Sequence, residues 1–211
     1  LKAENPIINK IESSSHELGD DFEIWQGLIA YGSKSQKRIW SSEKKETQFH
    51  RKLLYGGDIG KYFINWSGEY LKYGNWLHRP RPSYIYDKPK ILVQRIRNPQ
   101  LKNRIIAALD EDKYINGTGS SNIVENKKSK YDLKFILAVI NSELINFFFF
   151  FYFNDVNIKP EQLRKIPIIN GEINQKPFIS IVDKLMSAKS YDTKANTSSR
   201  ERQLDIMVYH L

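Results

Sequence analysis

The apolar segment from Leu133 to Phe153 is the strongest constraint on how this chain folds. It reads LKFILAVINSELINFFFFFYF and ends in seven consecutive aromatic residues. A membrane-spanning helix needs about 20 mostly apolar residues, and a charge near its centre costs about 2.5–3.5 kcal/mol. Because Asn141, Ser142 and Glu143 stand in the middle of the segment, the sequence predicts a buried amphipathic helix and not a membrane span.

This predicted core helix covers residues 133–151 and has one broad apolar face. Its polar residues Asn141 and Ser142 are expected to contact a sheet or another helix. A Phe148→Ala change is expected to cost about 3–5 kcal/mol of stability if the ring is fully buried. The apolar face is expected to contain Ile136, Val139, Ile140, Leu144, Phe147 and Phe148.

The length of 211 residues predicts one domain, or one domain with an appendage. The absence of cysteine excludes disulfides, cysteine zinc sites and thiol catalysis, and it fits a cytoplasmic location. No stretch near the N-terminus has the pattern of a signal peptide. Because the sequence starts at Leu1, it is interpreted as a piece of a longer polypeptide.

The positive charge is concentrated in one part of the chain. Residues 31–110 contain seventeen Lys and Arg against six acidic residues, a net charge of +11. By the same count residues 1–30 carry −4 and residues 111–211 carry +2, which gives the total of +9. Basic residues interleaved with aromatic residues are typical of a nucleic-acid surface. The alternative is a solvated basic face that only supports solubility.

The hydrophobic pattern changes from short strands to helices near residue 130. Residues 1–21 are expected to be a linker or the end of a preceding domain, residues 22–170 a recognition domain, and residues 171–211 a C-terminal helical extension. Strands followed by helices indicate an α+β fold, here a mixed, mainly antiparallel sheet with a buried core helix and a C-terminal helical pair. Strands are expected near residues 24–31, 39–40, 53–55, 62–66 and 91–96, with a hairpin formed by 104–109 and 113–116.

One enzymatic alternative is a metal-dependent nuclease. Asp110 or Asp112, with Glu125 and Lys127, would hold Mg²⁺ and position a lysine near the attacking water. The competing interpretation is a hairpin turn and a solvated strand end. Phosphate-binding glycine loops and nucleophile elbows are absent from the sequence, and the four histidines are scattered.

Five stretches in register resemble the TaqI-like C-terminal specificity domain of adenine-N6 DNA methyltransferases and fused restriction–modification enzymes. They are FEIWQGLIAYGS at 22–33, LLYGGDIGKYFINWSGEYLKYG at 53–74, YDKPKILVQRI at 86–96, LKFILAVINSELINFFF at 133–149 and IKPEQLRKIPI at 158–168. The resemblance covers about residues 22–211. Asp58, in the Gly-Gly-Asp-Ile turn, is expected to be structural and to cap main-chain amides.

The resemblance implies a target-recognition domain that binds double-stranded DNA in a sequence-specific way. The family's catalytic motif, [Asn/Asp]-Pro-Pro-[Tyr/Phe], is absent because no two prolines are adjacent. The fragment is therefore expected to be no enzyme and to bind no cofactor or metal itself. The expected partners are double-stranded DNA and a methyltransferase domain of the same chain, which would bind S-adenosylmethionine, methylate adenine and, in a fused enzyme, also cleave DNA. The other hypothesis is a protein-interaction module, in which the C-terminal helix pair docks on a methyltransferase or restriction subunit.

Residues of four stretches are candidates for contact with DNA, because Arg pairs with guanine, Asn and Gln pair with adenine, and Lys binds phosphate. The stretches are a polar basic loop at 34–38, a stiff arm at 79–81, the end of a strand at 94–104 and a loop of small donors at 116–122. The candidates are Lys34, Ser35, Lys37, Arg38, Arg79, Arg81, Gln94, Arg95, Arg97, Lys102, Arg104, Asn116, Thr118, Ser121 and Asn122.

Overall fold

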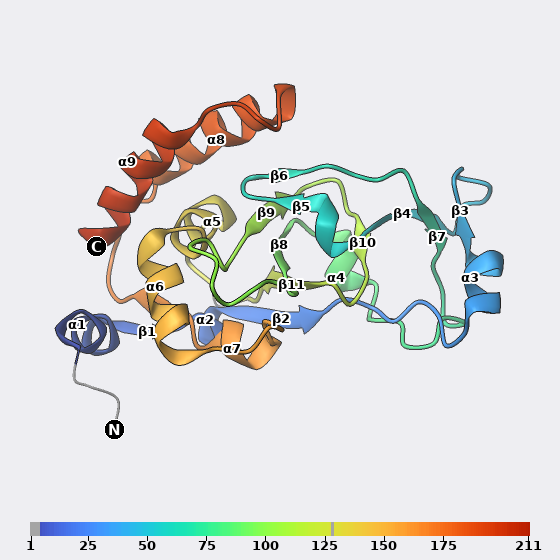
Figure 1. The fold of residues 1–211 in the computed structure, drawn as a ribbon, viewed down its shortest axis with the longest axis horizontal. Coiled ribbons are helices and arrows are strands. Elements are labelled where there is room, and N and C mark those ends of the chain that lie inside the picture. The colour runs from blue at the N-terminus through green and yellow to red at the C-terminus, as the bar shows by residue number, and fades with distance from the viewer. Residues whose placement is uncertain (1–4, 128) are drawn as a thin grey trace.

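A computed structural model describes residues 5–127 and 129–211 (Figure 1). The α+β class expected from the sequence is confirmed, since the described residues form antiparallel-rich sheets and a helical layer. Figure 1 shows α1 at one end of the long axis and α3 and β3 at the other, with α8 and α9 along one side.

The first sheet is antiparallel and has the strand order β2-β11-β8-β9. One face of this sheet packs on a layer of helices formed by residues after 132, and the opposite face packs on the second sheet. Lys90 and Leu92 alternate with Ile91 and Val93, so the two sets point to opposite faces. The strands are β2 (Phe22–Gln26), β11 (Ser120–Glu125), β8 (Lys90–Gln94) and β9 (Ala107–Asp110).

The second sheet has the order β10-β4-β7-β3, with a parallel β10–β4 pair and antiparallel pairs elsewhere. It extends away from the helical layer toward α3 (Figure 1). The two sheets approach closely at Gly27, where a Cβ atom would lie 2.1 Å from the carbonyl oxygen of Gly117. The strands are β10 (Ile115–Asn116), β4 (His50–Leu54), β7 (Tyr70–Lys72) and β3 (Ser41–Ser42).

Short elements connect the strands of the two sheets. The Gly-Gly-Asp turn behaves as expected, because the Asp58 carboxylate accepts from Tyr55 N at 2.8 Å and from Ser67 Oγ at 3.2 Å. The elements are α3 (Lys34–Trp40), the 3₁₀ turn η1 (Gly56–Asp58), β5 (Ile59–Gly60), β6 (Phe63–Ile64) and α4 (Tyr84–Asp87).

Two strand predictions are wrong. Residues 39–40 belong to helix α3, which begins after the N-cap Ser33. Residues 104–109 and 113–116 do not form a hairpin, because β9 pairs with β8 whereas β10 pairs with β4. The chain crosses between the sheets here, and Asp110 at the end of β9 forms an ion pair with Lys90, its partner across the β8–β9 pair.

The predicted core helix is two helices, α5 (Leu133–Ile140) and α6 (Glu143–Tyr152), bent by 60°. The break has a local cause, since Ser142 is extended and caps α6 by accepting from Ile145 N at 3.2 Å. Among the described residues no single helix is long and apolar enough to span a membrane, and α5 and α6 reach that length and composition only together.

The predicted apolar face of this segment is wrong at Phe147, which is 37% exposed, whereas Phe148 is 6% exposed. Helix α6 starts a new direction at Ser142, so the 3.6-residue period of α5 does not continue into it.

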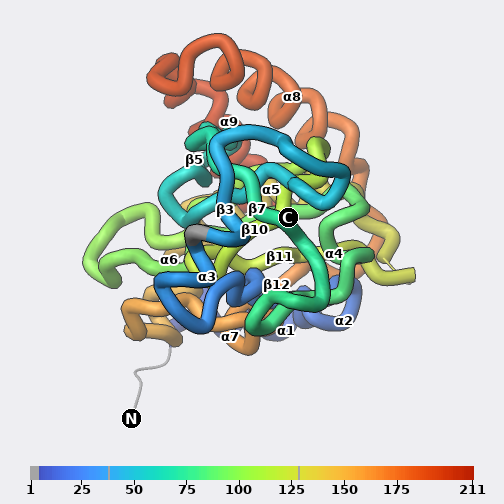
Figure 2. Tube along the Cα trace, turned by 90° about the vertical axis from the view of Figure 1, so that its right-hand side faces the viewer, coloured from blue at the N-terminus to red at the C-terminus, as the bar shows by residue number. Residues whose placement is uncertain are grey.

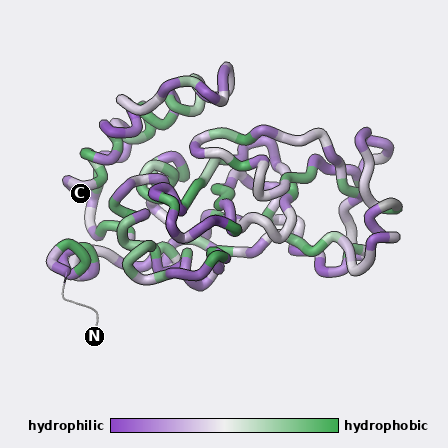
Figure 3. Tube along the Cα trace, viewed as in Figure 1, coloured by the Kyte–Doolittle hydropathy of each residue, from purple (hydrophilic) through white to green (hydrophobic). Residues whose placement is uncertain are grey.

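The helical layer also contains α8 and α9, which run antiparallel to each other and both contact α5 (Figure 1). Along α8 the hydropathy colours alternate from turn to turn, as expected for a helix with one buried face (Figure 3). Phe178, Val182 and Leu204 lie in the same core as α5. The elements are α7 (Pro160–Arg164), α8 (Lys176–Tyr191) and α9 (Ser198–Tyr209).

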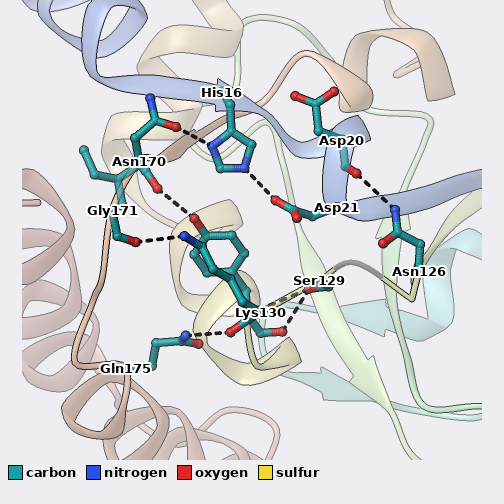
Figure 4. Close-up of polar contacts among 11 residues, drawn as sticks. His16, Asp20, Asp21, Asn126, Ser129, Lys130, Asn170, Gly171 and Gln175 are labelled. Atoms are coloured by element: carbon teal, nitrogen blue, oxygen red, sulfur yellow. Dashed lines mark hydrogen bonds and ion pairs between the residues drawn. The ribbon is translucent and has the colours of Figure 1, made fainter.

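Residues 6–21, which were expected to be a linker or the end of a preceding domain, pack on this same unit. Strand β1 pairs antiparallel with β12, and Leu18 is fully buried. His16 bonds Asn170 at 2.9 Å and Asp21 at 2.5 Å (Figure 4). Contacts therefore cross the boundary expected at residue 21. The elements are α1 (Pro6–Ser14), β1 (Ser15–Glu17), α2 (Leu18–Asp21) and β12 (Pro167–Ile169).

Candidate nucleic-acid interface

The cations of the basic stretch predicted to face DNA divide into those that bond main-chain or side-chain acceptors within the fold and those that face solvent. Arg95 belongs to the first group. Its Nε donates to the carbonyl of Ile158 at 3.0 Å and one terminal nitrogen donates to the carbonyl of Thr118 at 2.7 Å. Burial lowers the pKa of the Arg95 guanidinium. Arg95 thus joins the end of β8 to two segments that are distant in sequence.

Arg97 and Gln94 form a second structural pair. Arg97 donates to the Gln94 side-chain oxygen at 2.6 Å and to the carbonyl of Asn103 at 2.8 Å. Gln94 in turn donates to the carbonyl of Gly56 at 2.8 Å. Reading of bases by this pair would require breaking these bonds.

Arg104 is 1% exposed and donates to the carbonyls of Phe153 and Asp155. Its guanidinium carbon lies 5.1 Å from the centre of the Phe149 ring, a cation–π distance. A residue buried in this way cannot contact DNA in this conformation. Lys102 is exposed, but its ammonium pairs with Glu143 at 2.7 Å.

The loop of small donors at 116–122 is also not a free surface. Its residues fold into β10 and β11, and Asn116, Ser121 and Asn122 have no exposed surface. Asn116 donates to Ser120 Oγ at 2.7 Å. Of the four candidates in this loop, Thr118 alone is exposed, at the turn between the strands.

Several solvent-facing cations lie at the end of the molecule that carries α3, which faces the viewer in Figure 2. We define the α3 tip as residues 33–49 and 74–79. These segments contain six Lys and Arg against two Glu. Among the described residues, the exposed cations of the tip without an ion pair or side-chain hydrogen bond are Lys34, Lys37, Lys44, Lys45 and Arg79.

The predicted basic loop at 34–38 is a helix, and this correction matters for how the tip is held. Ser33 caps α3, and Gln36 accepts from Gly32 N at 2.6 Å. Ser35 is exposed and bonds the hydroxyl of Ser33 at 2.9 Å. The candidate side chain of Arg38 lies outside the part of the chain that the structure describes.

The arm at 79–81 joins the tip to the first sheet. The main chain of Arg79 pairs with Ile29, and the side chain of Arg79 is exposed. Arg81 instead donates through Nε to the carbonyl of Gln26 at 3.0 Å. The arm thus supplies one exposed cation and one structural one.

Sequence reasoning missed Lys44 and Lys45. They stand between Glu43 and Glu46, so a local charge count gave no signal. In the structure Glu46 turns back toward Ser42 Oγ, at 2.8 Å, while both lysines face solvent.

The geometry does not favour the metal-nuclease alternative. Asp110 is fully buried against Lys90, two strands away from β11, which carries Glu125. Burial raises the pKa of Asp110 and lowers that of Lys90. The charge of each partner shifts the pKa of the other in the opposite direction, but burial outweighs it. In the part of the chain that the structure describes, no three His, Cys, Asp or Glu residues come together as a metal site.

Comparison with known proteins gives one family. The family model described as the TaqI-like C-terminal specificity domain matches residues 51–168, more than half of the chain. No curated protein sequence matches.

Two solved structures are similar over most of this chain. One is the HsdS subunit from Thermoanaerobacter tengcongensis, with 10% identity, a TM-score of 0.48, and coverage of 96% of this chain and 48% of that chain. The other comes from work on complex assembly and conformational transition of the type I R-M system, with 14% identity, a TM-score of 0.48, and coverage of 93% and 43%. The chain thus spans less than half the length of either protein.

Proposed function

The chain belongs to the TaqI-like C-terminal specificity domain family, and from this premise we propose that it is a target-recognition domain that binds double-stranded DNA for a restriction–modification system. The observation that carries the proposal is the α3 tip, where exposed cations without ion pairs gather on one end of the fold. Phosphate contacts of this kind position a protein on DNA, and groups beside them read the bases.

The proposal includes a catalytic partner. We propose an adenine-N6 methyltransferase that binds S-adenosylmethionine, either in the same polypeptide or as a separate subunit, with DNA cleavage as a further activity of a fused enzyme. This fragment would hold the duplex while the partner takes the target adenine out of the stack.

Salt dependence of binding tests the role of the tip. Each phosphate neutralised by a cation contributes about −0.9 to the slope of log K against log salt, so about five contacts predict a slope near −4.5. A triple change of Lys34, Lys44 and Lys45 to Gln is expected to make the slope shallower by about 2.7. The matched control changes Lys176, Lys184 and Lys194, which are exposed on α8 and the following loop, and removes the same charge.

Equal slopes for the two triple variants would contradict the assignment of the tip. Binding that does not depend on salt, or no binding to a pool of duplexes, would contradict the function itself. An Arg95→Gln variant adds a second control, because Arg95 bonds main-chain carbonyls and its loss is expected to lower stability without changing the slope.

The alternative role as a docking module is less well supported. The apolar stripes of α8 and α9 that would meet a partner are used inside the fold, where Phe178, Leu185, Leu204 and Val208 are buried in the core with α5. The outward faces of both helices are mainly polar, with Tyr191, Ile206 and Tyr209 as their exposed apolar or aromatic residues.

A further inference from the structure

Three aromatic rings form a cluster within the α3 tip. The Trp76 ring lies 5.9 Å from the Trp40 ring and 5.7 Å from the Phe49 ring, the latter at 87°. Offset and edge-to-face arrangements at these distances are favourable. The Lys72 ammonium lies 5.8 Å and 5.6 Å from the centres of the Trp40 and Trp76 rings, within cation–π reach.

The cluster is held in place by main-chain contacts. The Trp76 indole donates to the carbonyl of Lys72 at 2.9 Å, and Tyr73 N donates to the carbonyl of Phe49 at 2.9 Å. The Trp76 ring lies over Gly74, where a Cβ atom would be 2.4 Å from the ring. The absence of a side chain at residue 74 therefore permits this ring position.

Although fixed, the rings are not buried. Phe49 is 47% exposed and Trp76 is 40% exposed, and Ile39, also in the tip, is 62% exposed. Single exposed apolar residues are ordinary, but several that gather and are rimmed by charge mark an interaction surface. Here the rings share the tip with exposed lysines, and the Lys72 ammonium lies near two of them, which favours an anionic partner.

We propose that Phe49 and Trp76 contact the bases of duplex DNA, either by packing on the thymine methyl groups of the major groove or by stacking at a base step. This inference rests on the proposed function and deepens it. Rigid apolar rings gain nothing from a phosphate, so their contribution is to base contact, whereas the lysines of the tip supply the phosphate contacts. The two rings would thus contribute to sequence preference, and the cations to affinity for any duplex.

Selection from a random-sequence duplex pool tests this assignment. The protein is first used to enrich a preferred duplex, and its affinity for that duplex and for a scrambled one is then measured. Trp76→Ala and Phe49→Ala are expected to weaken binding to the preferred duplex roughly 5- to 150-fold, the range that loss of an aromatic–base contact gives. Affinity for the scrambled duplex and the salt slope are expected to stay unchanged.

The matched aromatic control is Tyr191→Ala, because Tyr191 is 90% exposed at the end of α8. Circular dichroism checks that each variant folds, and if Trp76→Ala does not fold, the more exposed Phe49→Ala carries the test alone. Unchanged preference in a folded ring variant overturns this inference and leaves the function intact. An equal loss of affinity for both duplexes also overturns it. A wild-type protein that binds no duplex overturns the proposed function, and the inference with it.

Discussion

The side-chain amide of Asn141 hydrogen-bonds both main-chain groups of Ala107. Its Oδ1 accepts from Ala107 N at 2.9 Å and its Nδ2 donates to Ala107 O at 3.0 Å. Strand β9 is the last strand of its sheet, so Asn141 takes the place of a further strand at this edge. The expectation that this asparagine makes a polar contact to the sheet is confirmed.

Loss of this contact is expected to destabilise the protein. Asn141→Ala leaves the buried Ala107 N–H without a partner, which costs about 1–3 kcal/mol. Urea unfolding measures the change in the free energy of unfolding. Ser190→Ala, on the exposed surface of α8, is the control and is expected to stay within about 0.5 kcal/mol of the wild type. A similar value for the two variants would show that Asn141 does not hold β9.

The aromatic run provides a matched pair of ring deletions. Phe148 is 6% exposed and Phe150 is 54% exposed on the same helix. Phe148→Ala is expected to cost about 3–5 kcal/mol, because it opens a cavity, whereas Phe150→Ala is expected to change stability by at most about 0.5 kcal/mol. Thermal and urea unfolding distinguish the two. A large loss of stability in Phe150→Ala would contradict the placement of the Phe150 ring on the solvent-facing side of α6.

The buried pair of Lys90 and Asp110 predicts a strong difference between a single and a double change. Both side chains are fully buried, so Asp110→Asn leaves the lysine charge without its partner and is expected to cost about 3–5 kcal/mol. Replacement of both, as Lys90→Met with Asp110→Leu, is expected to be neutral or stabilising by about 1–4 kcal/mol. Equal destabilisation of the two variants would mean that the pair is needed for more than charge balance.

The pH dependence of stability is expected to report on the ion pair between Lys61 and Glu201 of α9, whose charged atoms lie 2.7 Å apart. Burial alone would raise the pKa of Glu201, but hydrogen bonds from Lys61 and Thr197 outweigh it, and the pKa is lowered from 4.5. A carboxyl whose pKa is lowered by folding adds stability above its ordinary pKa, and this stability is lost as the pH falls through the folded-state pKa.

Glu201→Gln is therefore expected to be less stable than the wild type at pH 7 and to approach it in acid. The measured quantity is the difference in unfolding free energy between the two proteins at each pH. The difference is used because burial raises the pKa of neighbouring Asp205. That carboxyl makes the fold less stable as the pH rises, which is opposite to the effect of Glu201, and it does so in both proteins. A difference that does not change between neutral and acidic pH would contradict the ion pair with Lys61.

Local patterns in the sequence predicted the class of fold, the polar contact of Asn141 and the capping role of Asp58. These features depend on residues that are near in the chain or on a strong apolar periodicity, which is why they could be inferred without coordinates. The same patterns failed at the break after Ile140, because Ser142 is compatible both with a helix interior and with an N-cap, and in the structure it caps α6.

The sequence by itself determined two things: residues 31–110 are rich in basic and aromatic residues, and the chain carries the motifs that identify the family. Only the tertiary structure decided which cations are available to a ligand. Arg95 is committed to carbonyls 23 and 63 residues away, whereas Lys44 and Lys45, between two glutamates, face solvent. A cation donates to whichever acceptor the fold brings near it, and those acceptors come from distant segments that no local pattern specifies.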